Sequence, residues 1–262
     1  MSGFKHDVDC KRCGAKFQIE TIDNYVDPEE LDFVDQLCES CQDIYSDELQ
    51  YSETQFIGNQ KIKDGMTQLF MGLEEEFKLD WKNDENFKGT PERIARSYIE
   101  KCRGINSAEK CKQIMKIGFP SKYRQMIVVP GVRVYSLCPH HFENVVYTID
   151  IGYFPKKKVV GLSKLSRVAI LYGAQPILHE TLVRDLVHIY QEGLDAKGVI
   201  VRATGQHGCM TARGIKQPGS CAVMVDYSGC FESAKSGYTP AEDYRNEFYG
   251  HVSHAQKEIT KL

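Results

Sequence analysis

The chain has 262 residues, a formal net charge of −3 and 42% hydrophobic residues, values that are ordinary for a soluble globular protein. The charge argues against bulk nucleic-acid binding, and no apolar run approaches the roughly 20 residues that a membrane-spanning helix needs. The N-terminus has no apolar signal-peptide core, so we expect a cytoplasmic protein. In that compartment, ten cysteines indicate metal binding or catalysis rather than disulfides.

Residues 1–50 form a predicted four-cysteine zinc-binding module. Cys10 and Cys13 make one C-x-x-C pair, and Cys38 and Cys41 make a second pair. Four thiolates can close a tetrahedral structural zinc site. The segment has too few apolar residues for a core of its own, so the metal would supply much of its folding free energy. A redox or disulfide role is the alternative.

Residues 51–120 form a predicted N-terminal helical region. Apolar residues between Ile62 and Leu73 recur at spacings of three and four, which favours an amphipathic helix. Thr90 followed by Pro91 has the composition of a helix start, with threonine as N-cap and proline in the first turn. A further short helix is expected at 108–117.

Residues 121–235 are predicted to form an α+β catalytic domain, and residues 236–262 a polar C-terminal tail. Runs of β-branched and aromatic residues predict two strands, then two helical segments follow, and two more strands complete the region. The expected segments are 126–135, 142–154, 162–172, 177–194, 197–207 and 220–231. Their order is β-β-α-α-β-β, with the first strands joined as an antiparallel pair.

A second zinc site is predicted where the strands of this domain end. Cys138 and His141 flank a tight turn, and Cys209 lies on a later strand that could pair beside the first hairpin. Three protein ligands would leave a fourth position for a water, which zinc converts into a nucleophile near neutral pH. His140 and His207 are then the candidates for proton transfer. The alternative is a closed structural site in which one of these two histidines is the fourth ligand.

Basic residues close in sequence to this cluster favour an anionic substrate, most simply a phosphorylated one. Ser163 and Lys164 open the first predicted helix of the domain, and Arg167 follows one turn later. A helix N-terminus with lysine and arginine can bind phosphate. Arg213 follows Cys209 by four residues. Solvated surface charge is the alternative for each of them.

Glu180 interrupts an otherwise apolar helical segment. A carboxylate that pointed inward there would need a partner, and it could accept two hydrogen bonds from an amidine-like edge such as that of guanine. A solvated helix face is the alternative.

Four ordered motifs resemble those of the GTP cyclohydrolase I family, which carries C-E-H-H, G-L-S-K-L-x-R, Q-E-R-L-type and H-x-C-x-x-x-R-G segments. Here they are Cys138-Pro139-His140-His141, Gly161 to Arg167, His179 to Leu182 and His207 to Gly214. Upstream, Gly89 to Ala95 resembles the T-P-x-R-I/V-A segment of the family, and Ile151 to Pro155 resembles its I-G-Y-x-P turn. The resemblance covers roughly residues 57–231.

The resemblance implies a T-fold whose subunits assemble as a homodecamer of two pentamers, with active sites at subunit interfaces. It also implies that zinc-bound water attacks C8 of the guanine in GTP, giving formate and 7,8-dihydroneopterin triphosphate. By motif match, the zinc ligands are Cys138, His141 and Cys209. The groups that act on the substrate are His140 and His207 for protons, Glu180 for guanine, Ser163 and Lys164 for ribose and phosphates, and Arg167 and Arg213 for the triphosphate.

Three positions depart from the family pattern. Pro139 replaces glutamate, His179 replaces glutamine and Thr181 replaces arginine; His179 would touch the guanine pocket. The zinc module is also outside the usual family core, which favours a specialised lineage that feeds 7-deazaguanine synthesis rather than tetrahydrofolate. Two alternatives remain. One is a T-fold enzyme of queuosine-type metabolism, such as the nitrile reductase with its cysteine nucleophile and nicotinamide cofactor. The other is a non-catalytic binding or regulatory homologue.

Overall fold

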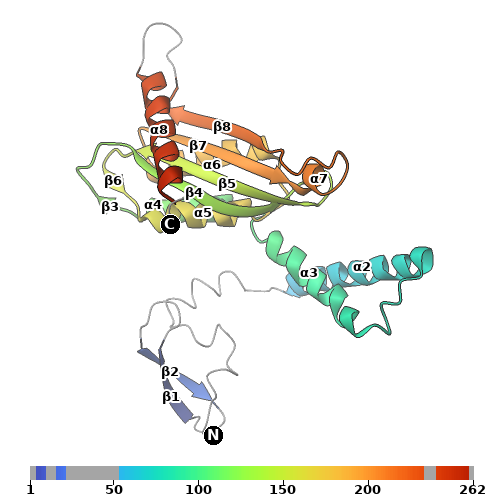
Figure 1. Cartoon of the computed structure of the whole chain (residues 1–262). Helices are drawn as coiled ribbons and strands as arrows, with labels where there is room; N and C mark the ends of the chain where they lie inside the picture. The colour runs from blue at the N-terminus through green and yellow to red at the C-terminus, as the bar shows by residue number, and fades with distance from the viewer. Residues whose placement is uncertain (1–3, 10–15, 22–52, 233–239, 260–262) are drawn as a thin grey trace. The chain divides into compact units, whose positions relative to one another are not determined.

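The computed structural model describes residues 4–9, 16–21, 53–232 and 240–259 (Figure 1). The chain divides into two compact units, Met1–Pro91 and Glu92–Leu262, which are described separately. The four cysteines of the predicted zinc module, Cys10, Cys13, Cys38 and Cys41, lie outside the described residues. Within the described parts, no helix is long and apolar enough to cross a membrane.

The first unit contains a hairpin and a long helix. Strands β1 (Phe4–Asp9) and β2 (Lys16–Thr21) pair in antiparallel register, and α2 spans Glu53–Phe77. Beyond α2 the chain folds back through the 3-10 turn η1 (Glu85–Phe87). Phe70 of α2 is buried against Trp81 and Phe87, with ring centroids 5.5 and 6.0 Å apart. This aromatic contact fixes the end of α2 to the segment that follows it.

The second unit is a four-stranded antiparallel sheet with helices on both faces. The sheet order is β4 (Ile127–Leu137), β5 (Asn144–Phe154), β7 (Gly198–His207) and β8 (Ala222–Gly229). Helices α5 (Leu162–Gly173) and α6 (His179–Leu194) come between β5 and β7 in the chain. The predicted β-β-α-α-β-β order is therefore present. The remaining elements are α3 (Thr90–Lys101), α4 (Ala108–Lys116), β3 (Phe119–Pro120), β6 (Lys158–Val159), α7 (Gly208–Thr211) and α8 (Ala241–Ile259).

The main core lies between the sheet and helices α4, α5 and α6, which cover one face of it in Figure 1. Because side chains alternate along a strand, every second residue of β5 from Val145 to Tyr153 points into this core and is fully buried. Leu165 of α5 and Leu182 and Leu186 of α6 are fully buried against them. The continuous apolar packing holds the strand ends in fixed relative positions.

Helix α8 covers part of the opposite face, where the sequence predicted only a polar tail. Phe248 and Val252 of α8 pack with Phe154 and Ile200 of the sheet in a second, smaller core. A Cβ atom added at Gly152 would lie 2.7 Å from Phe248 Cδ2 and 2.9 Å from Ile200 Cγ2, so this glycine makes room for the helix. The apolar stripe of α8 is narrow and is separated by charged residues, which explains why the sequence pattern was weak.

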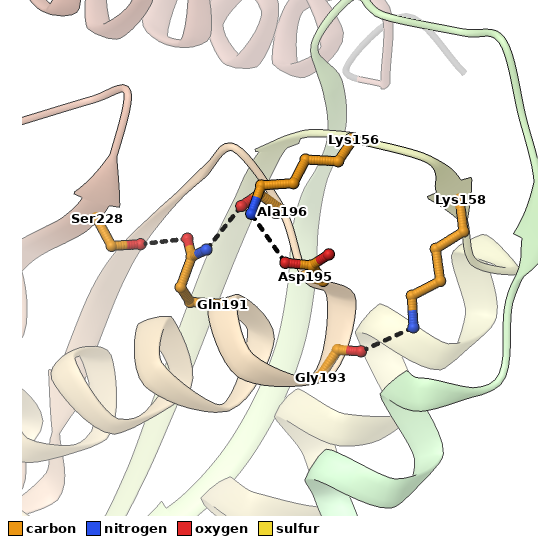
Figure 2. Close-up of polar contacts among 7 residues, drawn as sticks. All are labelled: Lys156, Lys158, Gln191, Gly193, Asp195, Ala196 and Ser228. Atoms are coloured by element: carbon orange, nitrogen blue, oxygen red, sulfur yellow. Dashed lines mark hydrogen bonds and ion pairs between the residues drawn. The ribbon is translucent and has the colours of Figure 1, made fainter.

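A set of polar contacts fixes the connection between α6 and β7 (Figure 2). Helix α6 ends at Leu194, and its C-cap residue Asp195 has a left-handed backbone conformation, with a φ of 49° and a ψ of 50°. Lys156 Nζ bonds Asp195 Oδ1 at 2.8 Å, and Lys158 Nζ donates to the carbonyl oxygens of Gly193 and Lys116 at 3.1 and 2.9 Å. The ammonium of Lys158 thus satisfies carbonyls at the C-terminal ends of both α6 and α4.

Candidate metal centre and active site

Three predicted ligands meet at one end of the sheet. Cys138 follows β4 directly, His141 lies in the turn to β5, and Cys209 lies in α7 just after β7. Strand register explains the meeting, since Val145 at the start of β5 pairs with His207 at the end of β7. The ligand atoms of Cys138, His141 and Cys209 all lie within 4.8 Å of one another.

The geometry of this cluster fits zinc. The two thiol sulfurs of Cys138 and Cys209 are 3.9 Å apart. Two thiolates bound at about 2.3 Å to a tetrahedral zinc would be separated by about 3.8 Å. Burial and the neighbouring Cys138 thiol raise the pKa of Cys209, whereas Arg213 lowers it. Zinc would hold both sulfurs as thiolates, because metal binding displaces the thiol protons.

Backbone contacts hold the turn that carries His141. Phe142 N donates to Cys138 O, and Cys138 N donates to Glu143 O, both at 2.8 Å. Phe142 has a φ of 55°, which reverses the chain tightly after His141. The Phe142 ring stacks on Tyr98 of α3 with centroids 6.0 Å apart. These contacts hold the conformation of the turn that carries His141.

His140 and His207, the predicted proton-transfer residues, both lie beside the cluster. His140 is exposed, and its Nδ1 is 3.9 Å from Cys138 Sγ. His207 is half-buried at the end of β7. Burial lowers the pKa of His207, and the carboxylate of Glu180 opposes this effect. His207 is therefore favoured in its neutral form, which can accept a proton.

Glu180 lies on the exposed side of the first turn of α6. Its side chain is not buried in the apolar part of the helix. Its negative charge nevertheless raises the pKa of both His207 and Tyr147, so the carboxylate is close to the cluster. It is thus free to contact a ligand that approaches from solvent.

His179 occupies a different place from the one predicted. Only 4% of its surface is exposed, so it does not line an open pocket. Its Nε2 lies 3.1 Å from Ala203 O, and because a carbonyl can only accept, Nε2 carries the proton. Burial, followed by the proximity of His207, lowers the pKa of His179 to about 4.

Tyr147 is a neighbour of the cluster that sequence reasoning missed. It is fully buried on β5, and its ring centroid lies 4.7 Å from that of His179 and 5.9 Å from that of His207. It pairs across the sheet with Gly205. The feature that could have indicated Tyr147 is its position opposite Gly205 on the neighbouring strand. This pairing can be recognised only when the strand register is known.

The basic residues divide between two places. Arg213 is exposed close to Cys209, whose pKa it lowers. Ser163 and Lys164, with Arg167 one turn later, belong to the N-terminal half of α5, and Lys164 Nζ donates to Ile117 O at 2.9 Å.

The N-terminal half of α5 points away from the metal cluster. The C-terminal end of α5 and the start of α6 adjoin the cluster, as the Leu137–Pro176 bridge shows. At 1.5 Å per residue, Lys164 is about 14 Å along the helix from that end. One chain therefore does not bring Ser163 and Lys164 to Cys138, His141 and Cys209.

Comparisons with known proteins agree with these motifs. A sequence model of the GTP cyclohydrolase I family matches residues 62–242. GTP cyclohydrolase 1 of Clostridium perfringens (strain 13 / Type A) is 35% identical over 175 residues, which are 67% of this chain and 91% of that protein. GTP cyclohydrolase 1 of Dehalococcoides mccartyi (strain ATCC BAA-2100 / JCM 16839 / KCTC 5957 / BAV1) is 29% identical over 197 residues, or 74% and 97% of the two chains.

Among solved structures, the apo form of the archaeosine synthase QueF-Like covers 41% of this chain and 97% of its own. It is 20% identical with a TM-score of 0.35, which is too low to support an argument. The family match and the Clostridium relative confirm the resemblance that the four motifs indicated. The chain belongs to the GTP cyclohydrolase I family.

Proposed function

We propose that this protein is a zinc-dependent GTP cyclohydrolase I that hydrolyses GTP to 7,8-dihydroneopterin triphosphate and formate. The observation that carries the proposal is the meeting of Cys138, His141 and Cys209 beside His207 and Glu180 at one end of the sheet. Relatives that share about a third of their residues with this chain are named GTP cyclohydrolase 1. The β-β-α-α-β-β sheet with its helices is our basis for proposing a T-fold.

The residues around the cluster can perform the proton transfers of ring hydrolysis. Bound to Cys138, His141 and Cys209, zinc would supply a water of lowered pKa as the nucleophile for C8 of guanine. His207, kept neutral by burial, can accept a proton as C8 is attacked and return it to the ring nitrogen that departs. His140 is exposed beside Cys138 and can exchange protons with solvent. Opening of the ring leaves C8 as a formamide, and a second water would hydrolyse the remaining C8–N bond to release formate.

Substrate binding would use charges on both sides of this centre. Glu180 would accept two N–H hydrogen bonds from the guanine edge, and Arg213 would bind phosphate oxygens. Ser163, Lys164 and Arg167 lie too far along α5 to reach the same centre. We propose that they come from a neighbouring subunit, so that each site is completed at an interface of a homodecamer. Thr181 and Pro139 are two positions at which the motifs depart from the family pattern.

We propose separately that Cys10, Cys13, Cys38 and Cys41 bind a structural zinc. A further proposal is that the product of the enzyme feeds a 7-deazaguanine pathway. Deletion of residues 1–50 tests whether the module matters for catalysis. We expect an accessory module, so GTP turnover and assembly should persist without it. Loss of both would show that the module is needed for the fold.

The central experiment combines product analysis with metal counting. Metal-loaded protein given GTP should release formate and yield a fluorescent pterin after oxidation. We expect about two zinc ions per chain, of which one is lost in Cys209→Ala and the other in Cys10→Ala. Cys230→Ala is the matched control. Cys230 is a half-buried cysteine directly after β8, at the end of the sheet away from the predicted zinc ligands. It should retain both ions and full turnover.

Two results would contradict the proposal. Intact GTP with no formate would exclude the reaction. Consumption of NADPH with 7-cyano-7-deazaguanine, independent of zinc, would instead indicate the nitrile reductase class.

A further inference from the structure

Two buried polar atoms behind the metal cluster have no hydrogen-bond partner among the described residues. They are Tyr147 Oη and His179 Nδ1. Tyr147 is fully buried and His179 is 4% exposed, so bulk water does not solvate either atom. A buried polar group without a partner destabilises a fold, because its lost hydration is not replaced. Two such atoms in neighbouring side chains therefore indicate that something binds both.

The two side chains belong to one compact group of rings. The ring centroids of Tyr147 and His179 are 4.7 Å apart, and those of His179 and His207 are 5.6 Å apart. A Cβ atom at Gly205 would lie 2.6 Å from Tyr147 Cε1 and 3.1 Å from His179 Cε1. Glycine at that position is therefore what lets both rings pack on β7 next to His207.

The two unpaired atoms have complementary chemistry. His179 Nε2 donates to Ala203 O, so Nδ1 has a free lone pair and can only accept. The phenol of Tyr147 can donate. A single water can accept from Tyr147 and donate to His179, and it retains two further hydrogen bonds. A buried water typically makes two to four such bonds.

We propose that Tyr147 Oη and His179 Nδ1 hold one internal water between them, and that this water positions the imidazole of His207. The inference rests on the proposed function for its catalytic part. Both partner side chains are too buried to touch a purine, so they are positioning residues that act through His207. A water is small enough to bridge two atoms that are buried among the described residues.

The water site can be tested without catalysis. A high-resolution crystal structure of the zinc-loaded protein should show one ordered water within hydrogen-bonding distance of Tyr147 Oη and His179 Nδ1. The isosteric variant Tyr147→Phe keeps the ring on Gly205 and removes the donor, so its crystals should lack the water. Absence of the water from wild-type crystals overturns the inference, whether or not the protein acts on GTP.

The positioning role is tested by steady-state kinetics with GTP. Tyr147→Phe should lower kcat about tenfold with little change in KM, since a displaced general base weakens the chemical step rather than binding. His179→Phe should do the same. The double variant should be about as slow as either single one, because both remove the same water. If His179→Phe does not fold, Tyr147→Phe and the crystal structure still decide.

Tyr190→Phe is the matched control. Tyr190 is fully buried in the same core, and its hydroxyl donates to Leu165 O at 2.7 Å. Losing this bond should lower the melting temperature and leave kcat unchanged. Two results overturn the positioning role: a wild-type kcat in Tyr147→Phe, or a double variant whose loss is the product of the single losses. A wild-type protein without GTP turnover would refute the proposed function and leave the water site to crystallography.

Discussion

At the scale of single residues, His179 shows how burial changes the behaviour of a titratable side chain. Its Nε2–H is bonded to Ala203 O, and its pKa falls from the usual 6.5 to about 4. The folded protein therefore keeps this imidazole neutral where an unfolded chain would protonate it. Protonation in the folded state would place a cation beside His207 inside the core.

This shift predicts a pH dependence of stability. Because the folded-state pKa is depressed, the unfolded chain binds the extra proton as the pH falls from about 6.5 to about 4. Above pH 6.5 the neutral His179 should not reduce the free energy of unfolding. By pH 4 the free energy of unfolding should have fallen by about 3 kcal/mol because of this residue. Chemical denaturation of chelator-treated wild-type protein and His179→Gln should diverge over this range, with the wild type losing more stability.

His188→Gln is the control for this titration. His188 lies on the same helix but is exposed. Its replacement should therefore leave the fall in the free energy of unfolding at low pH as in the wild type. Parallel curves for the wild type and His179→Gln would contradict the assigned environment of His179.

Residue-level prediction from sequence depends on residue type and spacing. Cys138, His141 and Cys209 were predicted because soft ligands flank strand ends, and the structure brings their ligand atoms together. Tyr147 was not predicted, because its significance depends on strand register and on Gly205 opposite it. His179 was expected at the substrate, yet a histidine at a helix start can turn either outward or inward.

At the scale of elements, α8 depends on a glycine in the sheet. Gly152→Ala would place a methyl group 2.7 Å from Phe248 and 2.9 Å from Ile200. Both neighbours are fully buried, so they cannot move aside easily. We expect a loss of about 1–3 kcal/mol in the free energy of unfolding, measured by urea denaturation.

Gly250→Ala, on helix α8 itself, is expected not to lower the free energy of unfolding. Gly250 is exposed within α8, and an added Cβ would meet nothing within 4 Å. Alanine is the better helix former by up to about 1 kcal/mol, so this variant should be as stable as the wild type or more stable. Equal stability losses for the two variants would argue against the packing of α8 on the sheet.

The two carbonyl contacts of Lys158 predict a second effect at this scale, and Figure 2 shows the one to Gly193. Lys158→Met removes an ammonium that bonds carbonyls at the ends of α4 and α6. We expect the free energy of unfolding to fall by about 1 kcal/mol, and the fall should shrink in high salt. The exposed neighbour Lys157 supplies the control variant Lys157→Met, which should change stability little.

Element order was readable from the sequence, whereas the last helix was not. Runs of β-branched residues and apolar periodicities predicted the β-β-α-α-β-β order that the sheet shows. In α8 the buried residues Phe248 and Val252 stand four apart in a mostly polar sequence. Such a narrow apolar stripe does not predict a packed helix until the sheet face with Gly152, on which Phe248 packs, is known.

At the scale of the whole molecule, the two groups of predicted substrate-binding residues lie apart. The candidate metal ligands are at the sheet end where Val145 pairs with His207, and Lys164 contacts Ile117 beyond the start of α5. Sequence proximity suggested one site, but a rigid helix separates its two parts. Assembly of several copies is the simplest way to bring a metal end and a phosphate-binding end together.

This arrangement predicts complementation between two inactive variants. Cys209→Ala removes a proposed metal ligand, and Lys164→Ala removes a proposed phosphate-binding charge, so each variant alone should be inactive with GTP. In co-expressed one-to-one mixed oligomers, about a quarter of the interface sites should combine an intact metal end with an intact Lys164. Purified mixed oligomers should therefore recover up to about a quarter of wild-type turnover, measured by formate release.

The matched control mixes Cys209→Ala with His207→Ala. Both residues lie at the same sheet end of one chain, so every metal end in that mixture carries one defect and no activity should return. If Lys164 served the metal cluster of its own chain, the Cys209→Ala and Lys164→Ala mixture would behave like this control. Recovery in the first mixture and none in the second can arise only when neighbouring subunits share a site.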